Sequence, residues 1–195
     1  MKKCFLAFVL MVSAIYSYCQ SPETKLPEVD KSPMDMCYYP KDYPVLKIQN
    51  KTSEPLIARV IYSRPQKNDR LIYGGLVEFG KVWRLGANEA TEIEFYKDAK
   101  IGGKKIVKGR YTLYAIVNTD TWTIIINKDT DTWGAFKYDE KKDLLRINVP
   151  VQKNSEITDA LAMTFEPIST SGKVTKNFSL TIAWDTLKVS LPIFL

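Results

Sequence analysis

The chain has 195 residues, of which 45% are hydrophobic and 26% are charged, and its formal net charge at pH 7 is +6. This length suits one ordinary domain whose core needs no metal or disulfide, and the composition excludes a disordered or fibrous protein. Histidine is absent, which excludes Ser-His-Asp and Cys-His nucleophile systems, histidine-ligated zinc or iron and an imidazole general base. Any catalysis would therefore have to use carboxylate, lysine, tyrosine or arginine side chains.

Residues 1–19 have the pattern of a cleavable signal peptide. Two lysines precede an apolar run over residues 5–12, which is shorter than the roughly 20 apolar residues that a membrane span needs. We expect cleavage after Cys19, which gives a periplasmic or extracellular protein that begins at Gln20. Acylation of Cys19 is the alternative, although the bulky Tyr18 disfavours lipoprotein processing. No later segment of the sequence is apolar enough to predict a membrane span.

Removal of this leader has two chemical consequences. Cys37 would be the remaining cysteine, so we expect no intramolecular disulfide and interpret its thiol as a bystander. The formal charge would fall from +6 to +4 through the loss of Lys2 and Lys3. Most of the basic residues are lysines scattered through predicted turns and strand faces, whereas nucleic-acid-binding proteins concentrate Arg and Lys on one face. We therefore expect no nucleic-acid partner.

Residues 20–44 are rich in proline, which predicts an extended linker ahead of a single β domain over residues 45–195. Within that domain, short β-branched and aromatic runs alternate with period 2 between Gly, Asn and Asp turns. The Gly102-Gly103 pair and residues 118–121 are typical of tight hairpin turns. The predicted strands cover residues 45–49, 56–62, 82–84, 91–96, 110–117, 122–127, 144–149, 161–168, 178–184 and 188–194.

Ten short strands without a long helical period predict an all-β fold. We expect an antiparallel β-sandwich, with a flattened β-barrel as the alternative. Apolar residues alternate over 178–184 and over 189–193, so one side of each of these strands should face the core, with a turn at 185–186 between them. Trp122 and Trp184 are in phase with core positions.

Residues 61–91 are unlike an ordinary strand and turn, with Ile-Tyr-Ser-Arg-Pro at 61–65 and Gly-Lys-Val-Trp-Arg-Leu-Gly-Ala-Asn-Glu at 80–89. The segment resembles the bacterial family called domain of unknown function 2911, exported proteins common in Bacteroidota. The resemblance extends over about residues 45–195, through 100–103, 109–113, 122–127, 133–136 and 189–192. It implies an exported β-rich domain without an established activity. Members often carry a histidine near the N-terminal end, which this chain lacks.

The same segment brings polar and aromatic side chains together among glycines that permit close backbone approach. One interpretation is a small polar pocket, where Arg64 and Arg84 hold an anionic or hydroxylated ligand beside an aromatic wall. The other is structural: Arg84 pairs with Glu89 beneath a long loop while Trp83 fills the core. The candidate ligand-binding residues are Tyr62, Arg64, Trp83, Arg84, Asn88 and Glu89.

Two further patterns are interpreted as structural. Residues 127–131 resemble the start of a calcium loop but lack its closing glutamate, so we expect a polar hairpin turn there. Glu92 and Glu94 share one strand face and are typical of solvent-facing positions. They are also the pair that a carboxylate-based hydrolase would need. No metal site and no cofactor are predicted.

The sequence thus favours a noncatalytic binding module for a small polar ligand, a glycan or a protein partner. The alternatives are a carboxylate-based hydrolase and a structural envelope protein that acts through strand edges or an apolar patch.

Overall fold

The computed structural model describes residues 24–170 and 173–195, so the predicted leader lies outside the described residues. Contacts divide the chain into two units, residues 1–30 and 31–195. Residues 24–30 have no regular secondary structure. The second unit carries all the strands described below.

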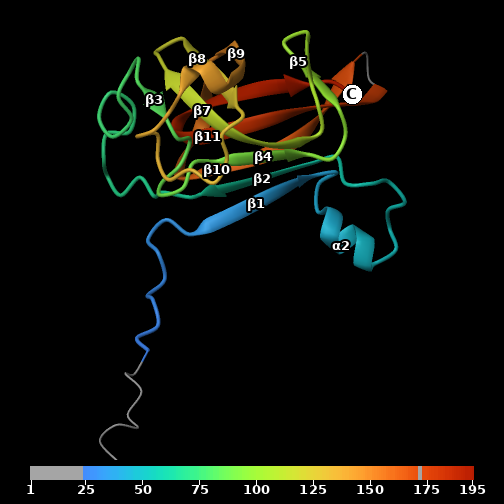
Figure 1. The fold of residues 1–195 in the computed structure, drawn as a ribbon, viewed down its shortest axis with the longest axis horizontal. Coiled ribbons are helices and arrows are strands. Elements are labelled where there is room, and N and C mark those ends of the chain that lie inside the picture. Colours follow the sequence, from blue (N-terminus) through green and yellow to red (C-terminus); the bar gives the residue numbers. More distant parts are fainter. Residues whose placement is uncertain (1–23, 171–172) are drawn as a thin grey trace, which may run out of the picture. The chain divides into compact units, whose positions relative to one another are not determined.

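Residues 31–195 form the predicted antiparallel β-sandwich, and none of the sheets in the described part of the chain closes into a barrel (Figure 1). The larger sheet has seven strands in the order β1-β2-β4-β7-β8-β9, with β3 beside β7. They are β1 (Met34–Tyr39), β2 (Ala58–Ser63), β3 (Val82–Trp83), β4 (Glu92–Phe95), β7 (Gly109–Val117), β8 (Thr121–Asn127) and β9 (Asp143–Pro150).

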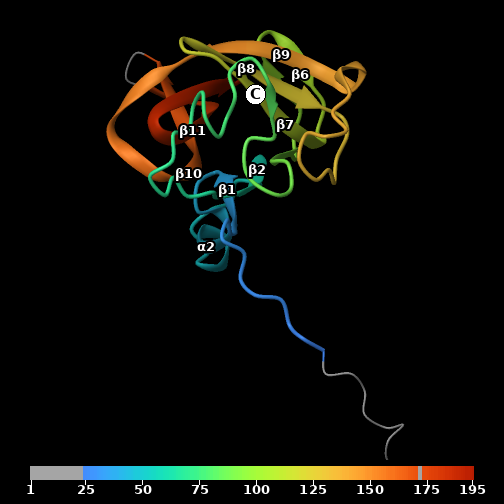
Figure 2. The same ribbon diagram turned by 90° about the vertical axis from the view of Figure 1, so that its left-hand side faces the viewer.

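Two long strands, β10 (Gln152–Thr170) and β11 (Lys173–Ile193), pair with each other and form the second layer. Figures 1 and 2 show them curving along one face of the larger sheet. A short hairpin of β5 (Ala99–Ile101) and β6 (Lys104–Ile106) completes the strands. Gly102 and Gly103 form its turn with φ of 56° and 79°, which confirms the predicted hairpin.

One core lies between the two layers, as the alternating patterns predict. The apolar side chains of one face of β11 are at most 1% exposed, and Trp122 on β8 is completely buried. The buried residues of β11 are Phe178, Leu180, Ile182, Trp184, Val189, Leu191 and Ile193. At about 25 cal/mol per Å² of apolar surface, burial of such large side chains is the main stabilising contribution to the fold.

The strand predicted at residues 45–49 is wrong, because residues 45–48 belong to helix α2 (Tyr43–Ile48) and Gln49 is its C-cap. Pro44 lies in the first turn of the helix, where its fixed φ and missing N–H are favourable. None of the helix residues is buried. The alternation of apolar residues in this segment suggested a strand, but the segment pairs with no strand and does not enter the core.

Part of the segment predicted as a linker is a strand. β1 pairs along its whole length with β2, from Met34 opposite Ser63 to Tyr39 opposite Ala58. Pro33 and Pro40 flank this strand without interrupting it, so they remove no hydrogen bond from the ladder. The folded unit consequently begins before residue 45.

The turn predicted at residues 185–186 is also absent, because β11 runs through it without a break. Asp185 has a φ of 54°, and the pairing between β10 and β11 shifts register beside it. A left-handed aspartate in a strand is typical of a β-bulge, which bends the strand without ending it.

Two helical turns complete the secondary structure, α2 and the 3₁₀ turn η1 (Glu140–Lys142). Among the described residues, no helix is both long and apolar enough to cross a membrane.

Candidate functional site

The six candidate residues lie in three separate places. Tyr62 and Arg64 contact Asp35 of β1. Asn88 and Glu89 adjoin residues 131–134. Trp83 and Arg84 line a cavity at the end of the sandwich where β3 lies.

The cluster around Asp35 is a structural contact between β1, β2 and β10. Arg64 donates from Nη1 to the Asp35 carboxylate at 3.0 Å and from Nε to the Leu161 carbonyl at 3.0 Å. Tyr62 is buried and accepts from the backbone N–H of Met163 at 3.0 Å, and burial raises its pKa to about 12. Because the polar groups of this cluster already have partners, it offers little to a ligand.

Residues 88 and 89 contribute chiefly backbone to the fold. Asn88 has a φ of 57°, and its carbonyl accepts from the backbone N–H of Gly134 at 2.8 Å. Glu89 forms a backbone bridge with Trp133, and its exposed side chain lines a smaller cavity of about 150 Å³. Within the described residues, no ion pair joins Glu89 to Arg84, so the predicted structural pairing of these two side chains is absent.

Strand β3 holds Trp83 in place. Val82 and Trp83 pair with Ile116 and Ala115 of β7. The Trp83 indole lies on that of Trp184, with ring centroids 6.0 Å apart and planes inclined by 19°, and its Nε1 donates to the Gly86 carbonyl at 3.2 Å. Such aromatic packing with the polar atom satisfied fixes a side chain firmly. Trp83 is therefore an anchored wall of the cavity.

The loop before β3 contributes Leu76, Val77 and Glu78 to the lining of the same cavity. Ile72 and Val77 are buried and connected by a backbone hydrogen bond of 2.8 Å, which ties the loop to the core. Between and beyond these anchors, Leu71, Leu76 and Phe79 remain 71%, 49% and 44% exposed. Of these three, Leu76 also lines the cavity.

The cavity between these walls has a volume of about 320 Å³, and we call it the Arg84 cavity. Its lining includes Leu76, Glu78, Lys81, Trp83, Arg84 and Phe136. Arg84, Trp83 and Leu76 also line an adjoining cavity of about 160 Å³, which reaches Arg70 and Trp184. A concave site of roughly 300 Å³ or more that combines apolar walls with a few charged groups is the usual form of a small-ligand site.

The chain has six arginines, all in the described residues. Arg84 differs from the other five in the contacts of its side chain. Arg59, Arg64, Arg110 and Arg146 each pair with a carboxylate. Arg70 donates to the backbone carbonyls of Gln66 and Lys67. The side chain of Arg84 has no hydrogen-bond or ion-pair partner among the described residues.

The Nε of Arg84 is buried and makes no hydrogen bond with any described residue. The same holds for Arg59 Nε, but the guanidinium of Arg59 binds Glu94 through Nη2. Desolvation by burial lowers the pKa of its guanidinium below the ordinary value. A buried donor without a partner costs about 1–3 kcal/mol, so most buried donors in proteins are bonded to a protein group, an ion or a water molecule. Arg84 thus presents a cationic group to the cavity with no acceptor for its side chain among the described residues.

Two exposed aromatic rings stack on each other beside the Arg84 cavity, and one of them lines it. Phe136 lines the cavity and is 79% exposed, while Trp133 is 60% exposed. Their rings stack with centroids 5.8 Å apart and planes inclined by 11°. Gly134, with a φ of 72°, lets the Phe136 ring fold back onto it, since a Cβ there would lie 2.7 Å from Phe136 Cε2. We call Trp133 and Phe136 the aromatic rim.

Sequence reasoning placed neither ring of this rim in the site. Both lie in the Trp-Gly-Ala-Phe run at 133–136, which the resemblance covered. Two large aromatic residues around a glycine, outside any alternating strand pattern, were the signal that could have identified them.

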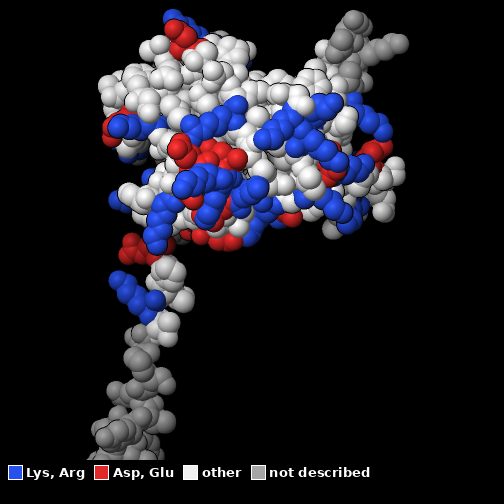
Figure 3. Space-filling model, turned by 45° about the horizontal axis from the view of Figure 1, so that its top comes forward, with Lys and Arg blue, Asp and Glu red and all other residues white. Residues whose placement is uncertain are grey.

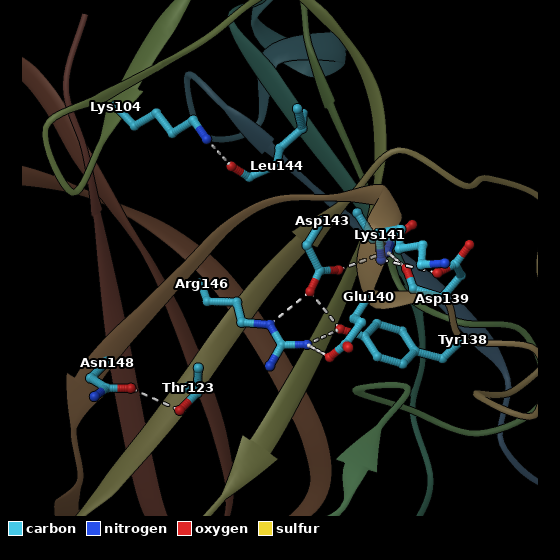
Figure 4. A network of polar contacts seen from close by, with 11 residues as sticks. Lys104, Thr123, Tyr138, Asp139, Glu140, Lys141, Asp143, Leu144, Arg146 and Asn148 are labelled. Carbon is cyan, nitrogen blue, oxygen red and sulfur yellow. Dashed lines mark hydrogen bonds and ion pairs between the residues drawn. The ribbon is translucent and has the colours of Figure 1, made fainter.

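A second polar cluster surrounds Asp143 between β8 and β9 (Figure 4). Its carboxylate accepts from Arg146 Nε at 2.7 Å, from Tyr138 Oη at 2.5 Å and from Asn127 Nδ2 at 2.7 Å. Arg146 also donates to Tyr138 Oη at 2.6 Å, and burial raises the pKa of that phenol. Such mutual satisfaction is typical of a network that fixes a turn. Asn127 thus serves the turn that we predicted over 127–131.

The other sequence candidates have structural surroundings. Glu94 pairs with Arg59 at 2.6 Å and Glu92 with Arg110 at 3.5 Å, across neighbouring strands. Among the described residues, no group of His, Cys, Asp or Glu is arranged to hold a metal ion. Burial, with a smaller effect of Asp35, raises the pKa of the Cys37 thiol to about 12, so the reactive thiolate is scarce.

The charged surface shows no concentration of one sign on the face drawn in Figure 3. Lys and Arg are spread over that face, and Asp and Glu lie among them. Interspersed charges of this kind are typical of a solvated surface.

The comparisons with known proteins fit this picture of a β domain with an unassigned cavity. The model of one family, DUF2911, described as a protein of unknown function, matches residues 44–193. The chain belongs to the DUF2911 family. This match confirms the resemblance inferred from residues 61–91, and in this DUF2911 protein it includes the whole lining of the Arg84 cavity. No curated protein and no solved structure matches the chain.

Proposed function

We propose that this protein is a noncatalytic binding module whose Arg84 cavity holds a small anionic ligand. The observation that carries the proposal is the guanidinium of Arg84, which lines the cavity, has a buried Nε and lacks a partner among the described residues. A carboxylate or a phosphate would supply the missing acceptors, and charge-assisted hydrogen bonds of this kind are about twice as strong as neutral ones.

The rest of the lining supports binding over catalysis. Glu78 is the single carboxylate among the lining residues, beside the cationic Lys81 and Arg84. Hydrolysis by paired carboxylates needs two such groups facing one cleft. Trp83 and Leu76 contribute apolar walls, which suit a ligand with both a charged group and an apolar face.

A thermal-shift series tests the proposal. The wild-type protein is heated with galacturonate, citrate or phosphate, beside Arg84→Gln and the matched control Arg110→Gln, whose arginine belongs to a surface ion pair. We expect at least one anion to raise Tm of the wild type and of Arg110→Gln, and to leave Arg84→Gln unchanged. Equal shifts in Arg84→Gln, or no shift with any anion in the wild type, would overturn the proposal.

We extend the proposal to the compartment in which the module acts. The leader pattern of residues 1–19 supports an exported protein whose ligand is met outside the cytoplasm. Expression of the full chain in a bacterial host tests this point. Recovery of a secreted or periplasmic form whose mass lacks these residues supports it, and full-length protein in the cytoplasm alone would contradict it.

A further inference from the structure

We infer that the ligand is an oligosaccharide containing uronic acid, with its carboxylate at Arg84 and a neighbouring sugar ring against the aromatic rim. This inference rests on the proposed function and names the class of ligand for the same site. Three features of the site carry it: the charges of the lining, the position of the exposed rings and the shortness of the adjacent strand.

The charges of the lining fit a hydroxylated carboxylate better than a phosphate. Lys81 and Arg84 are donors, whereas Glu78 is an acceptor that would repel a second negative charge. None of these three has an ion-pair partner in the described part of the chain. A uronic acid has one carboxylate for Arg84 together with hydroxyl groups that can donate to Glu78, so it matches both signs at once.

The aromatic rim is continuous with this charged lining. Ala135 and Phe136 belong to the lining, and Trp133 stacks on Phe136. Two large rings more than half exposed to water are unfavourable unless something covers them. The C–H face of a sugar ring is flat and apolar while its edge is polar, which suits an exposed ring face beside a polar cavity.

An acidic peptide is the main competing occupant, and the backbone near the cavity argues against it. Extended peptides usually bind by adding a strand to a sheet edge, where main-chain hydrogen bonds provide the affinity. β3 is the strand beside the cavity and has two residues, Val82 and Trp83. The next carbonyl, that of Arg84, already accepts from the backbone N–H of Thr91 at 3.1 Å. Little edge remains for a peptide.

Calorimetric titrations test the inference with four probes: galacturonate, its trimer, the fully methyl-esterified trimer and a glutamate trimer. The variants are the double Trp133→Ala/Phe136→Ala and, as a matched control, Phe194→Ala. This control removes an exposed aromatic ring whose backbone pairs with Lys100 of β5 and which does not line the Arg84 cavity. Both remove exposed rings, so folding should be preserved, and circular dichroism checks it.

We expect the galacturonate trimer to bind the wild type and Phe194→Ala about tenfold more tightly than the monomer, the gain typical of an added aromatic contact. In the double variant the trimer should bind no more tightly than the monomer, and the esterified trimer should bind weakly to all. A trimer no tighter than the monomer, a gain that survives in the double variant, or a glutamate trimer of equal affinity would overturn the inference.

The two proposals fail in different ways in this experiment. Monomer affinity in the wild type, compared with the same titration of Arg84→Gln, reports on the proposed function. The additional affinity of the trimer reports on the aromatic rim and therefore on the class of ligand. Monomer binding without a trimer gain leaves the anion site standing and removes the oligosaccharide.

Discussion

The indole of Trp83 lies against the indole of Trp184, so that the first sheet and the long β11 strand meet beside the Arg84 cavity. Trp184 is 1% exposed and belongs to the core, whereas Trp83 is half-buried and lines the cavity. Because Arg84 follows Trp83 directly in the chain, core packing fixes the backbone from which its side chain extends. The cationic group is thereby held in place without a partner of its own.

The first prediction concerns the stability that Arg84 costs the free protein. Arg84→Met should keep the apolar contacts of the side chain and remove its buried, unpaired donor. We expect the free energy of unfolding in urea to stay the same or to rise by about 1 kcal/mol. A loss of more than about 1 kcal/mol would show that the guanidinium supports the fold, which contradicts a role reserved for a ligand.

The second prediction concerns Arg64, which the structure places in a satisfied cluster. Arg64→Met removes hydrogen bonds to Asp35 and to the Leu161 carbonyl. We expect the free energy of unfolding to fall by about 1–2 kcal/mol in urea titrations, because two acceptors lose their partner. Anion binding should be unaffected. Weakened binding with unchanged stability would instead assign Arg64 to the ligand site.

The third prediction concerns the Cys37 thiol, whose pKa burial raises from 9.0 to about 12. The folded chain keeps this proton to higher pH than the unfolded chain, so the stabilising contribution is complete below pH 9 and is lost between pH 9 and 12. We expect the decline in unfolding free energy over that range to be shallower in Cys37→Ala. The remaining decline includes that of Tyr62, whose pKa is raised to about 12 in the same cluster. Identical pH profiles for the two proteins would contradict the burial of the thiol.

The fourth prediction concerns Gly134, which seats the Phe136 ring. Gly134→Ala places a Cβ against this ring and forces an alanine to adopt a φ of 72°. We expect a loss of about 1 kcal/mol in unfolding free energy from the backbone strain, together with weaker binding of the galacturonate trimer. Gly103→Ala is the control, because its φ is 79° and no atom lies within 4 Å of the added Cβ. Equal trimer affinity in both variants would show that the ring position is unimportant.

The sequence predicted most of the fold because the core strands have a strong period-2 pattern. Over 178–184, the apolar side chains at every second position are at most 1% exposed, as the alternation predicts. Predictions failed where tertiary contacts decide the outcome. Residues 45–48, predicted as part of a strand, are helical and not buried. Residues 34–39 form a strand because β2 offers an edge to them. The local sequence shows neither that residues 45–48 lack a neighbouring strand nor that residues 34–39 have one.

The candidate site was predicted in part. The 61–91 segment contains Trp83 and Arg84, which line the cavity. It also contains Arg64 and Tyr62, which turn to Asp35. Asp35 lies in the segment that we interpreted as a linker, so its pairing could not be foreseen. These residues are close together along the chain, and we therefore predicted one site. In the sandwich they belong to different strands and loops, which place them apart.

The most direct test of the central claim is the NMR signal of the Arg84 Nε–H group. The chain has six arginines, so their Nε–H cross-peaks are few, and Arg84→Lys assigns the one that disappears. On titration with galacturonate, the Arg84 Nε–H cross-peak should shift progressively, because a carboxylate bound at the Nη groups changes the charge distribution of the same guanidinium. The Arg110 cross-peak should not move. An Arg84 cross-peak that stays fixed while galacturonate saturates the protein would contradict the account.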